Sequence, residues 1–137
     1  MRLVPLAQVV IDVSRRLEVG RTPFGTRAIG ELAGARWEGE RFRARMVGAA
    51  AADWALTGDD DLLAVDVRMT LETDDGALLF LRYDGLLDPR QDPPIRSAMR
   101  FETADPRYAW MGRTLFIGCG TWDGVKTVRY EVFEVAA

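Results

Sequence analysis

The chain has 137 residues, of which 48% are hydrophobic and 28% are charged, and its formal net charge is −3. This length fits a single domain over residues 1–137, and the apolar share and interspersed charges exclude a disordered chain and a dedicated nucleic-acid surface. The absence of histidine and the single cysteine, Cys119, exclude a Ser-His-Asp triad and an internal disulfide, and they argue against zinc, haem and copper sites.

Three further features that are absent from the sequence bear on the expected cellular location of the protein and on metal binding. The sequence has no N-terminal basic and apolar signal segment and no apolar run of membrane-spanning length. We therefore expect a soluble cytoplasmic protein without a membrane partner. The acidic run Asp59–Asp61 lacks the alternating oxygen ligands of a calcium loop, so we interpret it as a solvated turn and expect no metal and no cofactor.

The N-terminal third predicts strands of uneven clarity. Val9, Ile11 and Val13 belong to a short β-branched run that is typical of a strand. The polar segment Ser14–Arg16 is interpreted as its charged exit. Residues 20–34 contain four glycines and a proline, which indicates either one strand or two strands broken by turns.

A clearer strand is predicted over Glu40–Val47, where Arg41, Arg43 and Arg45 alternate with apolar residues. Its basic face is either a solvated outer face of a sheet or an anion site. The alanines that follow lead into Asp53-Trp54, a carboxylate beside a large aromatic ring.

The strictest pattern predicts a β-hairpin. Apolar residues alternate with polar ones from Leu62 to Glu72, Asp74–Gly76 provides a tight turn, and Ala77–Tyr83 returns as the antiparallel partner. The returning strand is apolar on both faces, which favours a covering partner on its outer face. We therefore expect a homodimer formed through the outer face of Ala77–Tyr83.

The stretch Arg100–Gly120 combines aromatics, charges and turn residues. Asp105 before a proline can cap a short helical turn, which we expect near Pro106–Gly112. The aromatics on this turn either plug one end of the fold or border a ligand site. Asp88–Pro94 is predicted to be a loop, and Thr127–Val135 is predicted to be the last strand. The predicted fold class is all-β, an antiparallel barrel of about eight to nine strands.

The order of several motifs resembles the domain-of-unknown-function 3237 family over nearly the whole chain. These motifs are Gly25-Thr26-Arg27, Glu38-Gly39, Asp53-Trp54, Arg68, Thr73-Asp74-Asp75-Gly76, Phe101-Glu102-Thr103, Asp105-Pro106-Arg107-Tyr108-Ala109-Trp110 and Gly118-Cys119-Gly120. The resemblance implies a calycin-like or lipocalin-like β-barrel that tends to pair, and it implies no settled activity. The chain departs from the family pattern at Val47–Ala52, where relatives carry a proline and adjacent glycines. We therefore expect the loop that presents Asp53 to differ in shape from that of the relatives, because alanine does not share the freedom of glycine to adopt positive φ.

Without histidine, the available chemistry is proton transfer by carboxylates and phenols, assisted by arginine. Asp53 is a candidate general acid or base, because burial against Trp54 would raise its pKa. Glu102 is a second candidate carboxylate, Tyr108 a candidate donor to an oxyanion, and Arg68 a candidate anion ligand. The alternatives are structural: Asp53 caps a turn, Glu102 and Arg68 pair across strands, and Tyr108 packs under the helical turn.

We place the pocket where Asp53-Trp54 and Tyr108–Trp110 would converge at one barrel end, with Trp37, Trp54 and Trp110 as its apolar walls. The alternation leaves open whether Arg68 or its apolar neighbours face the interior. Two functions follow: a cofactor-independent isomerase, cyclase or lyase acting on a small aromatic or polyketide-like carbonyl compound, or a non-catalytic ligand-binding barrel. The expected partner in both cases is a small molecule.

Overall fold

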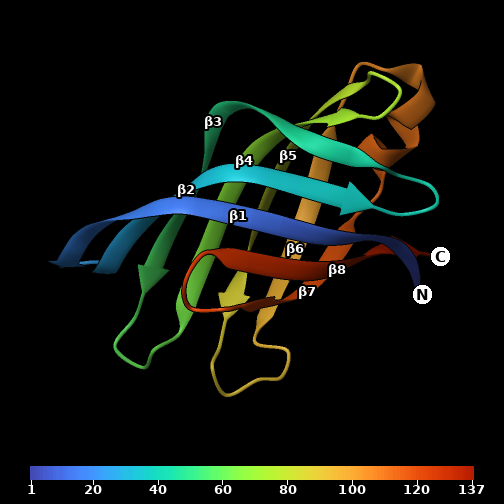
Figure 1. Cartoon of the computed structure of the whole chain (residues 1–137). Coiled ribbons are helices and arrows are strands. Elements are labelled where there is room, and N and C mark those ends of the chain that lie inside the picture. Colours follow the sequence, from blue (N-terminus) through green and yellow to red (C-terminus); the bar gives the residue numbers. More distant parts are fainter.

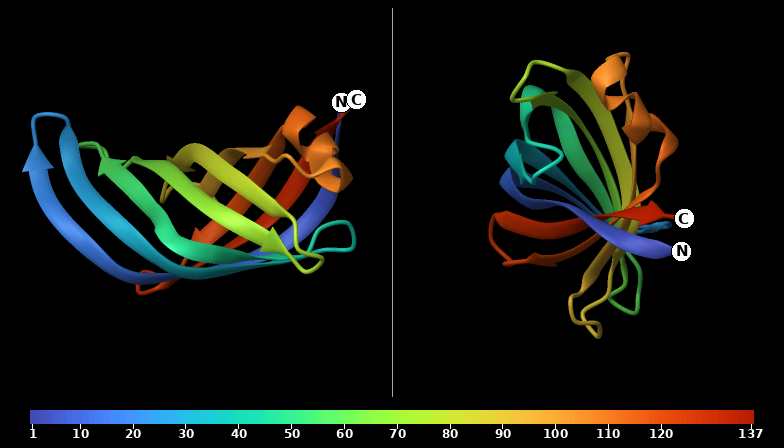
Figure 2. Two further views of the ribbon diagram at one scale, coloured as in Figure 1. Left: turned by 90° about the horizontal axis from the view of Figure 1, so that it is seen from above. Right: turned by 90° about the vertical axis from the view of Figure 1, so that its right-hand side faces the viewer.

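A computed structural model describes all residues of the chain, 1–137, as one antiparallel β-barrel. Eight strands follow one another around the barrel in chain order, and β8 closes it by pairing with β1 (Figures 1 and 2). A single 3-10 helix, η1, lies between β6 and β7. The elements are β1 (Arg2–Thr22), β2 (Gly25–Glu38), β3 (Ala44–Thr57), β4 (Leu63–Thr73), β5 (Leu78–Leu87), β6 (Ile95–Glu102), η1 (Pro106–Arg113), β7 (Phe116–Trp122) and β8 (Thr127–Ala136).

The hairpin predicted from strict alternation is confirmed. Strands β4 and β5 pair antiparallel, with Leu71 opposite Leu79 and Val67 opposite Tyr83. Gly76 has a φ of +91°, as the tight turn requires. The predicted helical turn is also confirmed, since the Asp105 side chain accepts a hydrogen bond from the Arg107 N–H and caps η1.

One predicted boundary near the N-terminus is wrong. Strand β1 does not end at Ser14–Arg16 but continues to Thr22. Residues 20–34 contain the end of β1 and the first part of β2, separated by a turn at residues 23–24, which agrees with the predicted alternative of two strands broken by a turn. Pairing between β1 and β8 stops at Asp12, so the rest of β1 pairs only with β2 and projects beyond the barrel (Figure 2). Both faces of this extension are open to solvent, which removes the apolar alternation that marks a strand.

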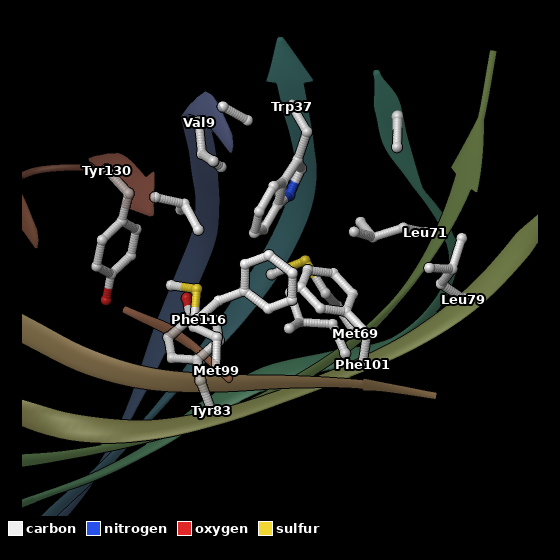
Figure 3. Packing of buried hydrophobic residues seen from close by; sticks show 14 of the residues in the cluster. Val9, Trp37, Met69, Leu71, Leu79, Tyr83, Met99, Phe101, Phe116 and Tyr130 are labelled. Carbon is white, nitrogen blue, oxygen red and sulfur yellow. The ribbon is translucent and has the colours of Figure 1, made fainter. Parts of the chain in front are cut away.

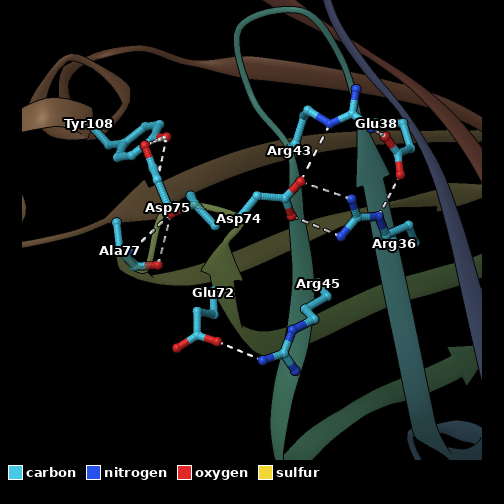
Figure 4. A network of polar contacts seen from close by, with 10 residues as sticks. Arg36, Glu38, Arg43, Arg45, Glu72, Asp74, Asp75, Ala77 and Tyr108 are labelled. Atoms are coloured by element: carbon cyan, nitrogen blue, oxygen red, sulfur yellow. Dashed lines mark hydrogen bonds and ion pairs between the residues drawn. The ribbon is translucent and has the colours of Figure 1, made fainter.

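A second boundary differs at the predicted basic strand. Strand β3 begins at Ala44, so Arg41 and Arg43 belong to the connection from β2. Arg43 and Arg45 form ion pairs with Asp74 and Glu72 of the β4–β5 hairpin (Figure 4). Arg43 therefore ties the β2–β3 connection to the β4–β5 turn, and Arg45 ties β3 to the neighbouring β4 at the same end of the barrel.

The same end of the barrel is filled by its own side chains. Trp37, Phe42 and Phe101 are buried and meet pairwise edge to face, with ring centroids 5.7–5.8 Å apart. Phe116 extends the cluster with a centroid 5.2 Å from that of Phe101. Figure 3 shows this packing, with Tyr130 at one side of the cluster and Leu71 and Leu79 at the other. Eight-stranded barrels are just wide enough to be filled in this way or to hold one small ligand.

The chain has no helix of the length and hydrophobicity needed to cross a membrane.

Candidate functional site

The other half of the barrel is not filled and forms a cavity of about 90 Å³ that is partly open to solvent. Its lining residues lie near the connections β3–β4, β5–β6 and β7–β8. These connections are at the end of the barrel opposite η1 (Figure 1). The walls of the cavity are mainly aliphatic. Those apolar walls include Ile11, Val13, Leu32, Ala55, Leu63, Val65, Val67, Leu87, Ile95 and Val128.

Asp53 places a carboxyl group among these apolar walls. Its Oδ1 accepts a hydrogen bond of 3.0 Å from the backbone N–H of Asp66, and no arginine or lysine forms an ion pair with it. Burial raises the pKa of Asp53 to about 6, and the nearby charge of Asp66 adds to this rise. The Asp66 N–H and the more distant Arg16 oppose it. Asp53 therefore exchanges protons readily near neutral pH.

Two phenols, Tyr83 and Tyr130, line the cavity with Asp53. Their rings meet edge to face, with centroids 5.6 Å apart, and the Tyr130 hydroxyl lies 3.0 Å from the Ser97 hydroxyl. Burial raises the pKa of both phenols above their ordinary value, and the charge of Asp53 contributes to both rises. Both tyrosines consequently stay protonated at neutral pH and can donate hydrogen bonds.

The glycines of β7 make room for one of these phenols. A Cβ atom on Gly118 would lie 2.9 Å from Cδ1 of Tyr130, and one on Gly120 would lie 2.7 Å from the same atom. The glycine-rich face of β7 is thus occupied by the ring of Tyr130.

Polar groups stand at the border of the cavity. Arg16 and Trp122 line it, and the Arg16 side chain is 43% exposed and lies 3.5 Å from the Glu18 carboxylate. The cavity therefore combines an apolar interior, one titratable carboxyl, two phenols and one cation near solvent. No group of three or more carboxylate, thiol or imidazole side chains is placed to hold a metal ion.

The predicted convergence of Asp53 with Tyr108 and Trp110 is wrong. Tyr108 lies on η1 at the filled end, where its hydroxyl donates to Asp75 Oδ1 over 2.9 Å (Figure 4). Trp110 packs against Phe116 there. The reason is topological: successive connections of a meander alternate between the two barrel ends, and η1 belongs to the β6–β7 connection.

The remaining predicted site residues also lie away from the cavity. Trp54 and Arg68 point outward, with the Arg68 guanidinium 5.3 Å from the Trp54 ring centroid, because Val65, Val67 and Met69 fill the interior. Trp37 is fully buried in the filled end, and Glu102 is exposed at the end of β6. Among the predicted site residues, only Asp53 borders the cavity.

Comparison with known proteins places the chain in a family. The sequence model of the family described as "Protein of unknown function (DUF3237)" matches residues 1–135. The chain belongs to this family. A curated relative, a UPF0311 protein of Rhodopseudomonas palustris strain TIE-1, is 29% identical over 122 residues, which are 78% of this chain and 77% of the relative.

Solved structures resemble this DUF3237 protein over almost its full length. A "beta-barrel like protein" from Acinetobacter baumannii has a TM-score of 0.88 and 29% identity, covering 98% of this chain and 96% of its own. A protein from Penicillium herquei, described as an enzyme, has a TM-score of 0.79 and 17% identity, covering 97% and 94%. These likenesses agree with the all-β barrel predicted for the DUF3237 chain.

Sequence reasoning missed Tyr83, Tyr130 and Ser97 as members of the site. A usable signal was present: each is a residue with a polar tip at an inward position of an otherwise apolar strand face. A buried phenol normally finds a hydrogen-bond partner, so two inward tyrosines on different strands indicate a polar point inside the barrel of this DUF3237 protein.

Proposed function

We propose that this barrel binds a small carbonyl compound in its cavity and acts on it as a cofactor-independent acid–base enzyme of the isomerase, cyclase or lyase type. The observation that carries the proposal is the Asp53 carboxyl, which lies inside an apolar cavity without an ion-pair partner and has a pKa of about 6. Such a group is costly for stability, and strongly perturbed carboxyls of this kind gather at functional sites.

The proposed step is a proton transfer next to a carbonyl group. The ionised Asp53 takes a proton from the carbon beside the carbonyl, and the electron pair of that C–H bond moves onto the carbonyl oxygen. Tyr83 and Tyr130 remain protonated, so each can donate a hydrogen bond to the resulting enolate in exchange for its partner within the chain. In a β,γ-unsaturated ketone the enolate extends over the neighbouring double bond, so the protonated Asp53 can return its proton to the γ carbon. The double bond then lies next to the carbonyl group, which completes an isomerisation without a cofactor.

The dimensions of the cavity limit the substrate. A cavity of about 90 Å³ is smaller than the roughly 150 Å³ cavity that takes up benzene, so it holds only part of an apolar ring and does not hold a sugar or nucleotide. Arg16 is partly open to solvent, so an acidic or longer portion of the compound has room beside it. A small aromatic or polyketide-like ketone matches both features. The Penicillium herquei barrel is described as an enzyme, so the fold is compatible with catalysis.

The second candidate function is binding without chemistry, as in lipocalin-like barrels. It is favoured by the Tyr130 hydroxyl, whose contact with Ser97 gives it a structural partner, and by the predominance of apolar side chains in the cavity. In this case Asp53 would only orient a polar group of the ligand.

Mass spectrometry of compounds retained from a cell extract tests the proposal. The buried Ala55 lines the cavity, whereas Ala33 is exposed on β2, so Ala55→Trp should block retention and Ala33→Trp should not. Retention of the same compounds by Ala55→Trp would contradict cavity binding. A retained compound that wild type converts and Asp53→Asn merely binds would support the enzyme, and a compound that neither converts would support the binding protein.

A further inference from the structure

The outer face of β4, β5 and β6 carries an unusual arrangement of charge. Arg68, Arg82 and Arg100 stand directly beside one another on the three neighbouring strands, in one row across the sheet. All three are exposed, and none forms an ion pair within the chain. Like charges placed directly opposite each other destabilise a sheet, so this row costs the isolated chain stability.

The next row along the strands carries the opposite charge. Asp66 and Asp84 are direct neighbours on β4 and β5, and they too form no ion pair within the chain. Two rows of unpaired charges of opposite sign therefore lie next to each other. A polyanion laid on the arginine row would also meet the aspartate row, so the pattern does not suit a nucleic acid or a phosphate-rich partner.

We propose that this face, defined as the outward residues of β4, β5 and β6, is a self-complementary interface that binds a second copy of the same chain. A two-fold axis that keeps the strands of the two facing sheets aligned runs either along the strands or across them. An axis along the strands places Arg82 on Arg82 of the second copy. An axis across the strands at the level of Tyr83 reverses the strand direction and places Arg82 on Asp84 of the second copy.

Rotation about the axis across the strands also brings the other residues of this face into pairs. Val67, Tyr83 and Met99 share one row, so residues equally spaced on either side of this row meet. Arg68 then stands over Asp66, Phe80 over Leu86, and Glu102 over Arg96, and each pairing occurs twice by symmetry. Leu86 is 51% exposed in the single chain, which a facing Phe80 would change. Oppositely charged or apolar positions match in these pairs, as an isologous interface requires, whereas Arg100 stands over Ala98 on the outermost of the three strands.

The proposed interface lies directly behind the cavity. Tyr83 points into the cavity from the inner side of the strand whose outer face forms the interface centre. Asp66 holds Asp53 through its backbone N–H on one side and presents its carboxylate to the second copy on the other. The second copy would therefore fix the strands that carry the site.

Charge reversal with light scattering tests this arrangement. Wild type at micromolar concentration should have twice the 15.3 kDa mass of one chain. Arg82→Glu and Asp84→Arg each place like charges together, so each variant should raise the dissociation constant of the dimer by roughly 100-fold and elute as a monomer. A mixture of the two variants should recover the dimer. In the mixed dimer the carboxylate introduced in one variant meets the guanidinium introduced in the other, and the native Asp84 of the first chain meets the native Arg82 of the second. The double variant should also dimerise by itself.

Arg129→Glu on β8 is the matched control, because Arg129 is exposed, has no ion pair within the chain and lies outside this face. It should remain a dimer, and circular dichroism should report the wild-type fold for every variant. A monomeric wild type would overturn the proposal. So would a dimer that Arg82→Glu leaves intact, or single variants whose mixture stays monomeric.

Discussion

Replacing Asp53 by asparagine should stabilise the protein at alkaline pH. In the folded protein burial raises the Asp53 pKa from 3.8 to about 6, so the folded state favours the protonated form. The stability that Asp53 contributes is therefore fully present below about pH 4 and is lost as pH rises through about 6. A difference of roughly two pKa units corresponds to about 3 kcal/mol at pH 8. Asparagine avoids this cost and keeps an oxygen that can accept the Asp66 N–H.

Thermal melting of wild type and Asp53→Asn at pH 4 and pH 8 measures this effect. For a chain of this size, about 3 kcal/mol corresponds to a rise in Tm of up to roughly 10 °C at pH 8, and the two melting curves should converge near pH 4. Asp123 provides a control of opposite sign. Hydrogen bonds from the N–H groups of Thr127, Val125 and Lys126 lower its pKa, so Asp123→Asn should lose stability at pH 8. A lower Tm for Asp53→Asn at pH 8, or a difference that does not change with pH, would refute the reasoning.

Two further substitutions separate the cavity from the filled end. Gly120→Ala puts a Cβ atom 2.5 Å from the Arg129 carbonyl oxygen and 2.7 Å from the Tyr130 ring. Urea unfolding should therefore show that the free energy of unfolding falls by roughly 1–3 kcal/mol, and the protein should retain less ligand. A variant as stable as wild type would contradict the close packing of Tyr130. Tyr108→Phe removes the hydrogen bond to Asp75 at the filled end, so Tm should fall by a few degrees at most while turnover and ligand retention stay unchanged. Loss of activity in Tyr108→Phe without loss of stability would instead show that Tyr108 belongs to the functional site.

Much of the fold follows from local patterns in the sequence. The β4–β5 hairpin is predictable because one strand face is buried over its whole length and a glycine permits the turn. The outer half of β1 is not predictable in this way, since it leaves the barrel and both its faces are solvated. Its β-bulges, near Asp12 and Val13, also break the period of two.

The site is harder to predict, because it depends on which barrel end each connection occupies. Asp53 was identifiable as a carboxyl within an apolar strand. Its partners were not, since a prediction of eight to nine strands leaves open whether η1 and Asp53 lie at the same end. With eight strands the β3–β4 and β6–β7 connections lie at opposite ends, so Tyr108 is separated from Asp53 and the inward Tyr83 and Tyr130 take its place.

Hydrogen–deuterium exchange of small ketones tests the central claim, proton transfer by Asp53 inside the cavity. Wild type and Asp53→Asn are incubated in deuterated buffer with 1-indanone and 2-tetralone, and proton NMR follows the hydrogens beside the carbonyl group. Wild type should accelerate their exchange above the buffer rate, and Asp53→Asn should reduce the protein-dependent rate by roughly 10²–10⁴-fold while binding the ketone equally well. Equal exchange rates with the two proteins, for a ketone that both bind, would contradict the claim.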